Sequence, residues 1–238
     1  MTGTISSLTL AVAVFVGGHF LLSSLTVRRP LVGALGENAF RGLYSLFALA
    51  SLVWVIAAYR EAPYEELWPV GTELLHIPLL TMPLACVLVV AGLSTRSITM
   101  VGGDAMAGDP DPVSGITTIT RHPFLWGVAL WALSHLAANG DVAGVILFGG
   151  FALLSLGGMA HIDYRRSVTL GSDWGPIAMT TSAIPFLAAV QGRRAVDWRG
   201  VGWGRLFAGL ALYVALPFLH PWIAGIPIVP HFLLDMIG

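Results

Sequence analysis

Six apolar stretches of about membrane length limit what this chain can fold into more than any other feature of its sequence. They cover approximately residues 4–25, 40–58, 74–93, 123–138, 141–160 and 204–222. A helix that crosses the hydrocarbon core of a bilayer needs about 20 mainly apolar residues. We therefore predict an all-α polytopic membrane helical bundle of about six transmembrane helices, with residues 1–238 as a single domain. Membrane lipid is the expected surrounding of such a bundle.

Composition supports a membrane protein and excludes several other classes. Hydrophobic residues make up 56% of the 238 positions and charged residues 11%, whereas soluble domains have about 45–50% apolar and about 25% charged residues. The formal net charge of -1 gives no basis for binding nucleic acid. The lone cysteine, Cys86, excludes an intrachain disulfide and any multi-cysteine metal or iron–sulfur site.

The basic residues indicate how the bundle is oriented. All twelve are arginines, and eleven of them lie in or beside the first, third and fifth loops between the predicted spans. Only Arg60 lies on the other side, in a loop that also carries four glutamates. Cytoplasmic loops carry an excess of basic residues. We therefore predict that these three loops are cytoplasmic and that both termini lie on the non-cytoplasmic side.

The fourth apolar stretch has recognisable helix boundaries. Arg121-His122-Pro123 precedes it, and a proline fits the first helical turn because its missing N–H has no partner there. The residue before a proline is disfavoured in the helical region, so the helix is predicted to begin at Pro123. Asn139-Gly140-Asp141 ends this helix and makes a tight link to the next one. The two helices are therefore predicted to form a hairpin.

Inside this helix, four side chains follow one another at four-residue steps: Gly127, Trp131, His135 and Asn139. Side chains at that spacing share one face of a helix. An ionisable imidazole at membrane depth usually marks a functional site, and the glycine and the flat aromatic beside it suit a flat cofactor. The other interpretation is a buried histidine that hydrogen-bonds to a neighbouring helix.

Three further histidines lie within the predicted spans or at their ends. His19 follows Gly17-Gly18 in the first span, and paired glycines let a second helix or a flat ligand approach the backbone. His76 begins the third span and His220 ends the last one. Packing glycines beside a hydrogen-bonded histidine are the alternative explanation for the first of these.

Polar residues at the ends of the spans supply other candidate site residues. These are Arg121, His122, Asn139, Asp141, Asp163 and Arg166. A solvated, ion-paired helix end explains the last two as well as chemistry does. After the fifth span we predict an interfacial helix and then a half-inserted segment around Ile184-Pro185-Phe186. The loop over residues 94–115 is rich in Gly, Asp and Pro, and its role is left open.

Six short motifs occur in the order and spacing of a known family. They are GITTITRHP (115–123), WALSH (131–135), DYRR (163–166), TTSAIPF (180–186), QGRR (191–194) and FLHP (218–221). With these motifs the chain resembles the NnrU family of membrane proteins, most densely over residues 115–222. The same domain occurs in the plant and cyanobacterial 15-cis-zeta-carotene isomerases. The resemblance implies an all-helical integral membrane fold and, through the family's bacterial members, a bacterial inner membrane.

In the isomerase branch the resemblance implies a haem b held by histidines, which by motif would be His19 and His135 in this chain. Trp131 and Gly127 lie beside His135 and complete the expected cofactor site. That branch has a cysteine three residues before the second histidine, where this chain has Ala132, so a thiolate ligand is absent here. The expected ligands are a hydrophobic polyene or nitric oxide, since the bacterial members take their name from denitrification.

The two histidines differ in their depth along the predicted helices. At a rise of about 1.5 Å per residue, His19 lies roughly 9 Å from the cytoplasmic end of its span and His135 roughly 18 Å from Pro123. A tilted porphyrin or tilted helices could join them. His220 and His76 match the depth of His135 better and are therefore the alternative second ligands.

Two other functions fit the sequence. The RHP before a membrane helix resembles the isoprenylcysteine carboxyl methyltransferases, in which case Arg121 and His122 would hold S-adenosylmethionine near the cytoplasmic face. That family pairs acidic residues after its last helix, whereas this chain has Asp163 beside arginines. In a non-catalytic assembly or transport factor, the histidines would be buried and paired without binding a cofactor.

Overall fold

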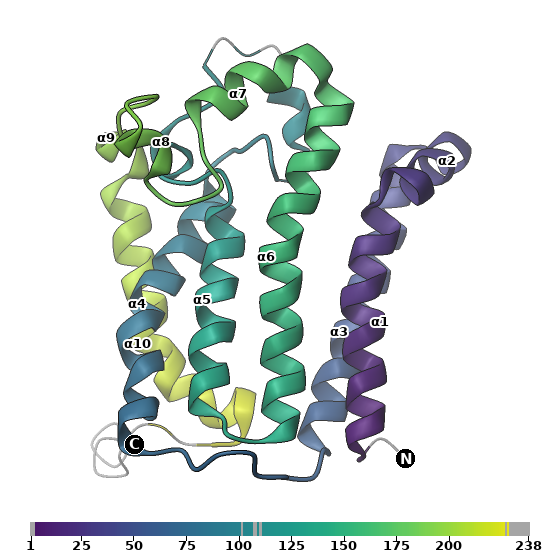
Figure 1. The fold of residues 1–238 in the computed structure, drawn as a ribbon, viewed down its shortest axis with the longest axis vertical. Coiled ribbons are helices and arrows are strands. Elements are labelled where there is room, and N and C mark those ends of the chain that lie inside the picture. The colour runs from purple at the N-terminus through teal and green to yellow at the C-terminus, as the bar shows by residue number, and fades with distance from the viewer. Residues whose placement is uncertain (1–2, 101, 107–108, 110, 227, 229–238) are drawn as a thin grey trace.

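The long helices of the chain run side by side and form an elongated bundle (Figure 1). The computed structural model describes residues 3–100, 102–106, 109, 111–226 and 228. Within these residues the regular secondary structure is helical, apart from one isolated β-bridge between Glu66 and Asp141. The all-α prediction is therefore confirmed for the part of the chain that the structure describes.

Each of the six predicted stretches forms one helix. The helices are α1 (Ile5–Ser23), α3 (Glu37–Arg60), α4 (Thr72–Ser94), α5 (Pro123–Ala138), α6 (Val142–Leu170) and α10 (Trp203–Ala224). All of these except α5 have the length and composition needed to cross a membrane, and α5 is apolar but has 16 residues. This set of helices fits an integral membrane protein.

Two boundaries differ from the prediction. α6 continues beyond the expected end at residue 160 as far as Leu170, because residues 161–170 contain neither proline nor glycine and the helix ends at Gly171, whose φ is 56°. The first loop, expected to be irregular, contains helix α2 (Leu25–Leu35). Ser24 separates α2 from α1, since its extended backbone ends one helix while its hydroxyl accepts a hydrogen bond from the Val27 N–H of the next.

The helices pack as two groups that meet at one end of the bundle. α4, α5, α6 and α10 form one group, and α1 and α3 form the other (Figure 1). Near the start of α1 the two groups share a core whose buried side chains include Leu8, Val12, Val55, Leu147 and Phe148. In lipid such contacts stabilise through close packing rather than through removal from water. Toward the other end, α1 and α3 diverge from α5 and α6 (Figure 1).

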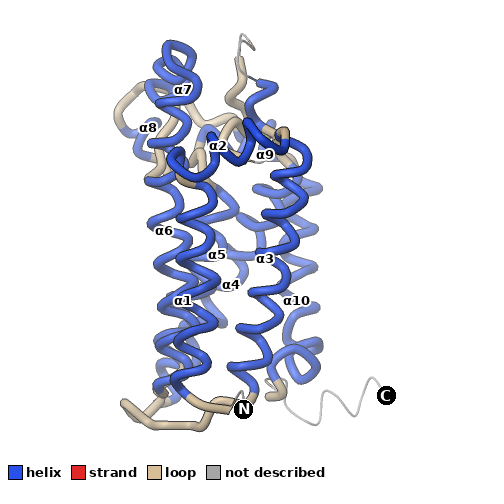
Figure 2. The backbone as a smooth tube through the Cα atoms, turned by 90° about the vertical axis from the view of Figure 1, so that its right-hand side faces the viewer, coloured by secondary structure: helices blue, strands red, loops and turns tan. Residues whose placement is uncertain are grey.

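The segments that carry most of the arginines lie together at one end of the bundle, which we call the arginine-rich end. α2 lies there with the short helices α7 (Trp174–Thr180), α8 (Leu187–Val190) and α9 (Trp198–Val201) (Figures 1 and 2). The start of α1 and the end of α10 lie at the opposite end (Figure 1). This arrangement agrees with the predicted even number of crossings. The side of the membrane on which each end lies stays a prediction.

The segment expected to be half-inserted forms a loop between α7 and α8. It packs on the motif before α5, because the Thr120 hydroxyl donates to the Ala183 carbonyl and the Phe186 N–H to the Ile119 carbonyl, both at 2.8 Å. Phe186 has a φ of 63°, a conformation that non-glycine residues rarely adopt. The Ile184 and Phe186 side chains are exposed. Their insertion into a membrane stays a prediction.

Candidate cofactor cavity

A cavity of about 780 Å³ opens where α1 and α3 diverge from α5 and α6; we call it the main cavity. Its volume falls within the range of about 300–1,000 Å³ found for small-molecule and cofactor sites. Much of its wall is apolar and is formed by Phe15, Phe20, Phe40, Phe124, Leu125, Val128, Phe151 and Leu154. Its polar side chains come from the parts of the helices that approach the arginine-rich end. The cavity therefore suits an amphipathic molecule with a flat or elongated apolar body.

His19 of α1 lines the main cavity with one ring nitrogen unpaired. Its Nδ1–H donates to the Phe15 carbonyl oxygen at 2.6 Å, and Nδ1 must carry the proton because a carbonyl only accepts. The Phe15 and Tyr44 rings lie 4.5 Å and 5.5 Å from the imidazole, measured between centroids. Within the described residues Nε2 makes no hydrogen bond. A neutral imidazole oriented in this way is a typical metal ligand.

His161 of α6 lines the same cavity, although its sequence position did not mark it as a candidate ligand. Its Nε2 and the Ser23 hydroxyl are hydrogen bonded at 3.0 Å, and its ring makes an edge contact with Phe20 at 5.6 Å between centroids. Ser23 lies one helical turn after His19 on α1. The two histidines therefore border neighbouring parts of one cavity wall.

His122, at the start of α5, is held by a buried ion-pair network. Its Nε2–H donates to Asp163 at 2.8 Å, and its side chain is 1% exposed. Arg121 donates to both oxygens of Asp163 at 2.7 to 3.0 Å and to the Thr181 hydroxyl at 3.2 Å. The Arg121 guanidinium also lies over the Trp174 ring. The network joins the RHP and DYRR motifs and fixes His122 at the cavity wall.

One carboxylate and four arginines line the polar end of the main cavity: Glu37, Arg28, Arg41, Arg165 and Arg166. Glu37 accepts hydrogen bonds from both Arg28 and Arg41, the latter at 2.8 Å. Arg166 is buried and donates to the Met100 carbonyl at 3.0 Å. The half-buried Arg165 makes no hydrogen bond or ion pair with any described residue. The sequence indicated Arg166 as a candidate, whereas Arg28 was expected from membrane topology and Arg165 from an ion-paired helix end.

His135 lies on α5 outside the lining of the main cavity. Its Nδ1–H donates to the Trp131 carbonyl oxygen at 2.9 Å, and its ring lies 5.4 Å from the Phe148 ring between centroids. Trp131 packs edge-on against Phe148 and Phe151 of α6. The structure therefore places His19, but not His135, on the main cavity. The pairing of these two histidines on one iron stays a prediction.

The other residues of the predicted α5 face lie in helix contacts and caps. Gly127 faces α4, and a Cβ at this position would lie 2.8 Å from a carbonyl oxygen of that helix. The Asn139 amide donates to the His135 carbonyl at 2.7 Å. Asp141 caps α6 by accepting from the Gly144 N–H at 2.9 Å. Packing and capping account for these three positions; the cofactor role predicted for Gly127 and the candidate roles of Asn139 and Asp141 are not tested by these contacts.

The two alternative ligands lie away from the main cavity. His220 of α10 donates from Nδ1 to the Ile226 carbonyl at 2.6 Å. His76 of α4 is exposed. Whether either residue binds a metal stays a prediction.

The start of the GITTITRHP motif is anchored to α9 by Asp197. The Asp197 carboxylate accepts from the N–H groups of Gly115 and Gly200, both at 2.9 Å. These two hydrogen bonds hold the pKa of the Asp197 carboxyl below its usual value. Gly115 has a φ of +54°, and a Cβ there would overlap the Gly200 carbonyl oxygen, so this position requires glycine.

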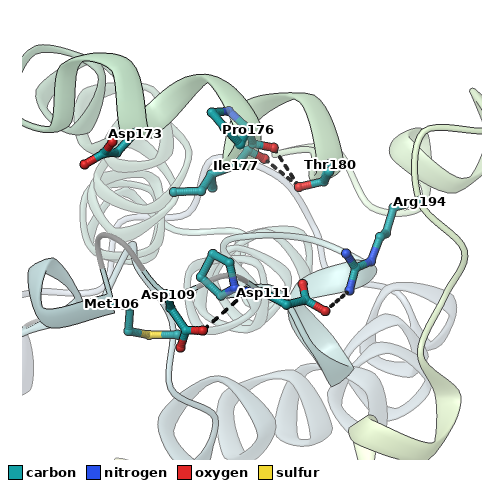
Figure 3. A pocket seen from close by; sticks show the side chains of 9 residues that line it. Met106, Asp109, Asp111, Asp173, Pro176, Ile177, Thr180 and Arg194 are labelled. Carbon is teal, nitrogen blue, oxygen red and sulfur yellow. Dashed lines mark hydrogen bonds and ion pairs between the residues drawn. The ribbon is translucent and has the colours of Figure 1, made fainter.

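A smaller cavity of about 210 Å³ lies beside α7 (Figure 3). Arg194 donates to Asp111 and to the Val113 carbonyl, each at 2.9 Å, whereas Asp173 lies apart from that pair (Figure 3). Among the described residues, no three His, Cys, Asp or Glu side chains are placed to hold a metal ion. Residues 101, 107, 108 and 110 of the 94–115 loop lie outside the described part of the chain.

Comparison with known proteins relates these features to a family. The family model described as "NnrU protein" matches residues 7–228. A chloroplastic 15-cis-zeta-carotene isomerase of Arabidopsis thaliana is 31% identical over 115 residues, which cover 47% of this chain and 31% of the relative. The Zea mays protein of the same description is 32% identical over 81 residues, which cover 34% of this chain and 22% of the relative. The matched segments thus span less than a third of these relatives, and no solved structure shows significant similarity to the chain.

Proposed function

The chain belongs to the NnrU family of membrane proteins, and we propose that it binds haem b in the main cavity and takes part in the redox-linked isomerisation of a hydrophobic polyene. Family membership and the likeness to zeta-carotene isomerases support an isomerase-related membrane protein. The cofactor, the substrate and the residues that bind them are part of the proposal.

The observation that carries the proposal is the His19 ring at the cavity wall. The hydrogen bond to the Phe15 carbonyl makes Nδ1 the donor and leaves Nε2 without a partner among the described residues. Such a hydrogen bond orients a ligating imidazole and raises the basicity of its other nitrogen. Histidine is a common axial ligand of haem iron. His19 would therefore hold the iron through Nε2.

The rest of the lining fits a porphyrin. Five phenylalanines supply flat apolar contacts: Phe15, Phe20, Phe40, Phe124 and Phe151. The charged side chains are confined to one end, as suits a cofactor that is apolar except along one edge. Haem b, when bound, would supply a redox-active iron whose axial positions exchange ligands.

For the second axial position we favour His161. It lines the same cavity as His19, whereas His135, which the resemblance offers, is packed against Phe148 outside that lining. His122 also lines the cavity, but its Nε2 is held by the carboxylate of Asp163, whereas the Nε2 of His161 is hydrogen bonded to the neutral Ser23 hydroxyl, which can rotate away. In this proposal the His122 network closes the cavity wall, and His161 is the ligand that exchanges.

A second function of the same site is nitric oxide binding, and Ala132 favours it. This residue replaces the cysteine that the isomerase branch has at the corresponding position, and it is completely buried. Without a thiolate to exchange, an iron held firmly by His19 alone would leave one position for a diatomic ligand. This function predicts nitric oxide binding without turnover of a polyene.

The visible spectrum of protein purified from haem-supplied cells tests the proposal. We expect a Soret band that shifts when dithionite reduces the iron. Isomerase activity is then measured on a cis-polyene in liposomes, with and without dithionite, and nitric oxide binding is followed from the same band. Colourless protein in the presence of ample haem would exclude the cofactor and favour a non-catalytic assembly or transport factor.

A further inference from the structure

Among the four arginines at the polar end of the main cavity, Arg165 makes no hydrogen bond or ion pair with a described residue. Glu37 is the carboxylate among the residues that line the cavity, and both Arg28 and Arg41 already donate hydrogen bonds to it. A guanidinium stays charged at physiological pH. Charges removed from water need compensation, which a protein supplies through ion pairs or bound ligands. An anionic group on a bound molecule would supply it here.

Arg165 is the arginine whose surroundings point most directly to a ligand. It extends from α6, is half-buried and lines the main cavity. Its guanidinium makes no hydrogen bond or ion pair with any described residue. The carboxylate that interacts with it electrostatically, Glu37, is shared by two other arginines. Its donor groups are therefore available to an occupant of the cavity.

Two neighbouring arginines are positioned by the protein itself. Arg28 pairs with Glu37 and lies over the Phe40 ring at 5.4 Å from the centroid. Arg166 is fixed by its bond to the Met100 carbonyl. Side chains that are already ordered lose little conformational entropy when a ligand binds. The polar end thus combines one available guanidinium with others that need little rearrangement.

The fork of donors on a guanidinium matches the two oxygens of a carboxylate or a phosphate. We infer that this end of the cavity binds the propionate carboxylates of haem b, with Arg165 as the central residue. The inference rests on the proposed haem site and names the residues that hold the charged edge of the cofactor. An anionic phospholipid would offer a phosphate to the same fork, so the experiment must separate the two sources.

The test compares haem b with its dimethyl ester, in which both carboxylates are masked. Haem-free protein in a non-ionic detergent is titrated with each compound, and binding is followed from the Soret band. The wild type should bind haem b at least about tenfold more tightly than the ester, because charge-assisted hydrogen bonds are strong. Arg165→Gln should weaken haem b binding and leave ester binding unchanged. The exposed Arg29, which does not line the cavity, provides the control variant Arg29→Gln.

The outcomes separate this inference from the proposed function. Equal affinity of the wild type for acid and ester, or an equal loss of both in Arg165→Gln, would overturn the carboxylate site while haem binding stands. Absence of a Soret band with either compound would refute the haem site and this inference with it. A further outcome is that native mass spectrometry finds phosphatidylglycerol on the wild type but not on Arg165→Gln. If the wild type then also binds haem b no more tightly than the ester, the Arg165 guanidinium binds lipid phosphate and the inference is wrong.

Discussion

His19 and His135 make the same local hydrogen bond and yet lie in different surroundings. In each ring Nδ1–H donates to the carbonyl oxygen four residues earlier, that of Phe15 or of Trp131. His19 lines a cavity between diverging helices, whereas aromatic side chains of α5 and α6 pack on His135, with the Phe148 ring 5.4 Å away. Helical spacing therefore fixes the hydrogen bond but does not decide whether the imidazole can reach a ligand.

The two histidines differ in their surroundings because α1 and α3 pack on α5 and α6 at one end of the bundle only. At that end, opposite the arginine-rich end, apolar side chains such as Leu8, Val55 and Leu147 hold the helices together. At the arginine-rich end, the facing segments of α2, α3 and α6 carry arginines, and like charges repel at close range. The cavity lies at the end of the bundle where the shared apolar core is replaced by these charged side chains.

The largest expected effect on stability comes from the network that closes the main cavity. Asp163→Ala leaves Arg121 and His122 without their shared acceptor, and the Arg121 and Asp163 side chains are only 15% and 20% exposed. Breaking a buried pair costs about 3–5 kcal/mol, and for these partly exposed groups we expect about 3 kcal/mol of unfolding free energy. Denaturant unfolding in detergent measures it. The exposed Asp173→Ala should change stability by less than about 0.5 kcal/mol, and equal losses would contradict the buried network.

A smaller effect is expected in the packed region. Gly127→Ala places a methyl group 2.8 Å from a carbonyl oxygen of α4, so we expect a loss of about 1–3 kcal/mol from overpacking with haem content unchanged. Gly17 also lies within a helix, but a Cβ added there would have no heavy atom of a neighbouring element within 4 Å. Gly17→Ala is therefore the control and should be neutral or slightly stabilising. Equal tolerance at both positions would show that α4 and α5 are not packed as described.

Acid should loosen the arginine-rich end before the opposite end. Because the pKa of Asp197 is lowered in the folded protein, its stabilising effect is complete above its usual value of 3.8 and is lost as pH falls through the lower folded value. Hydrogen exchange at the Gly115 and Gly200 amides should therefore accelerate below about pH 4, while exchange in the Leu8 core stays slow. Asp197→Asn should remove this pH dependence. Unchanged dependence in that variant would assign it to another group.

We expect that the protein does not bind S-adenosylmethionine. Arg121 and His122 are both held by Asp163, so binding that cofactor through them would require these bonds to be broken or shared. Calorimetry in detergent should give no saturable heat. A clear isotherm that His122→Ala abolishes would favour the methyltransferase function over the haem site.

Helix positions were largely predictable because apolar length and proline or glycine boundaries are local properties. α5 begins at Pro123, as the RHP motif predicted. The end of α6 was predicted too early, because the residues after 160 are polar and polar residues are common at helix ends. None of residues 161–170 is a proline or glycine, so the helix continues to Leu170. α2 was missed because Arg28, Arg29 and Pro30 were interpreted as the end of the first helix, although Pro30 lies inside α2.

The candidate site was predictable only in part. Arg121, His122 and Asp163 were selected from their motifs, but their contact depends on how α5 and α6 pack after the hairpin. Arg165 lies in the DYRR motif, but arginines at a cytoplasmic helix end are expected from topology alone, and nothing in the sequence around His161 indicates a neighbouring histidine. These two residues become candidates only because they line the cavity. The cavity forms where helices that are distant in sequence diverge, and the sequence alone does not show this.

The most direct test of the account compares haem binding in two matched variants, His19→Ala and His135→Ala, each purified with haem supplied in excess. Absorbance at the Soret band per mole of protein is the quantity measured. We predict that His19→Ala loses haem at least about tenfold, while His135→Ala keeps the wild-type spectrum and His161→Ala shifts it toward five-coordinate high spin. A colourless His135→Ala beside a fully loaded His19→Ala would contradict the account and place the iron in the packed region.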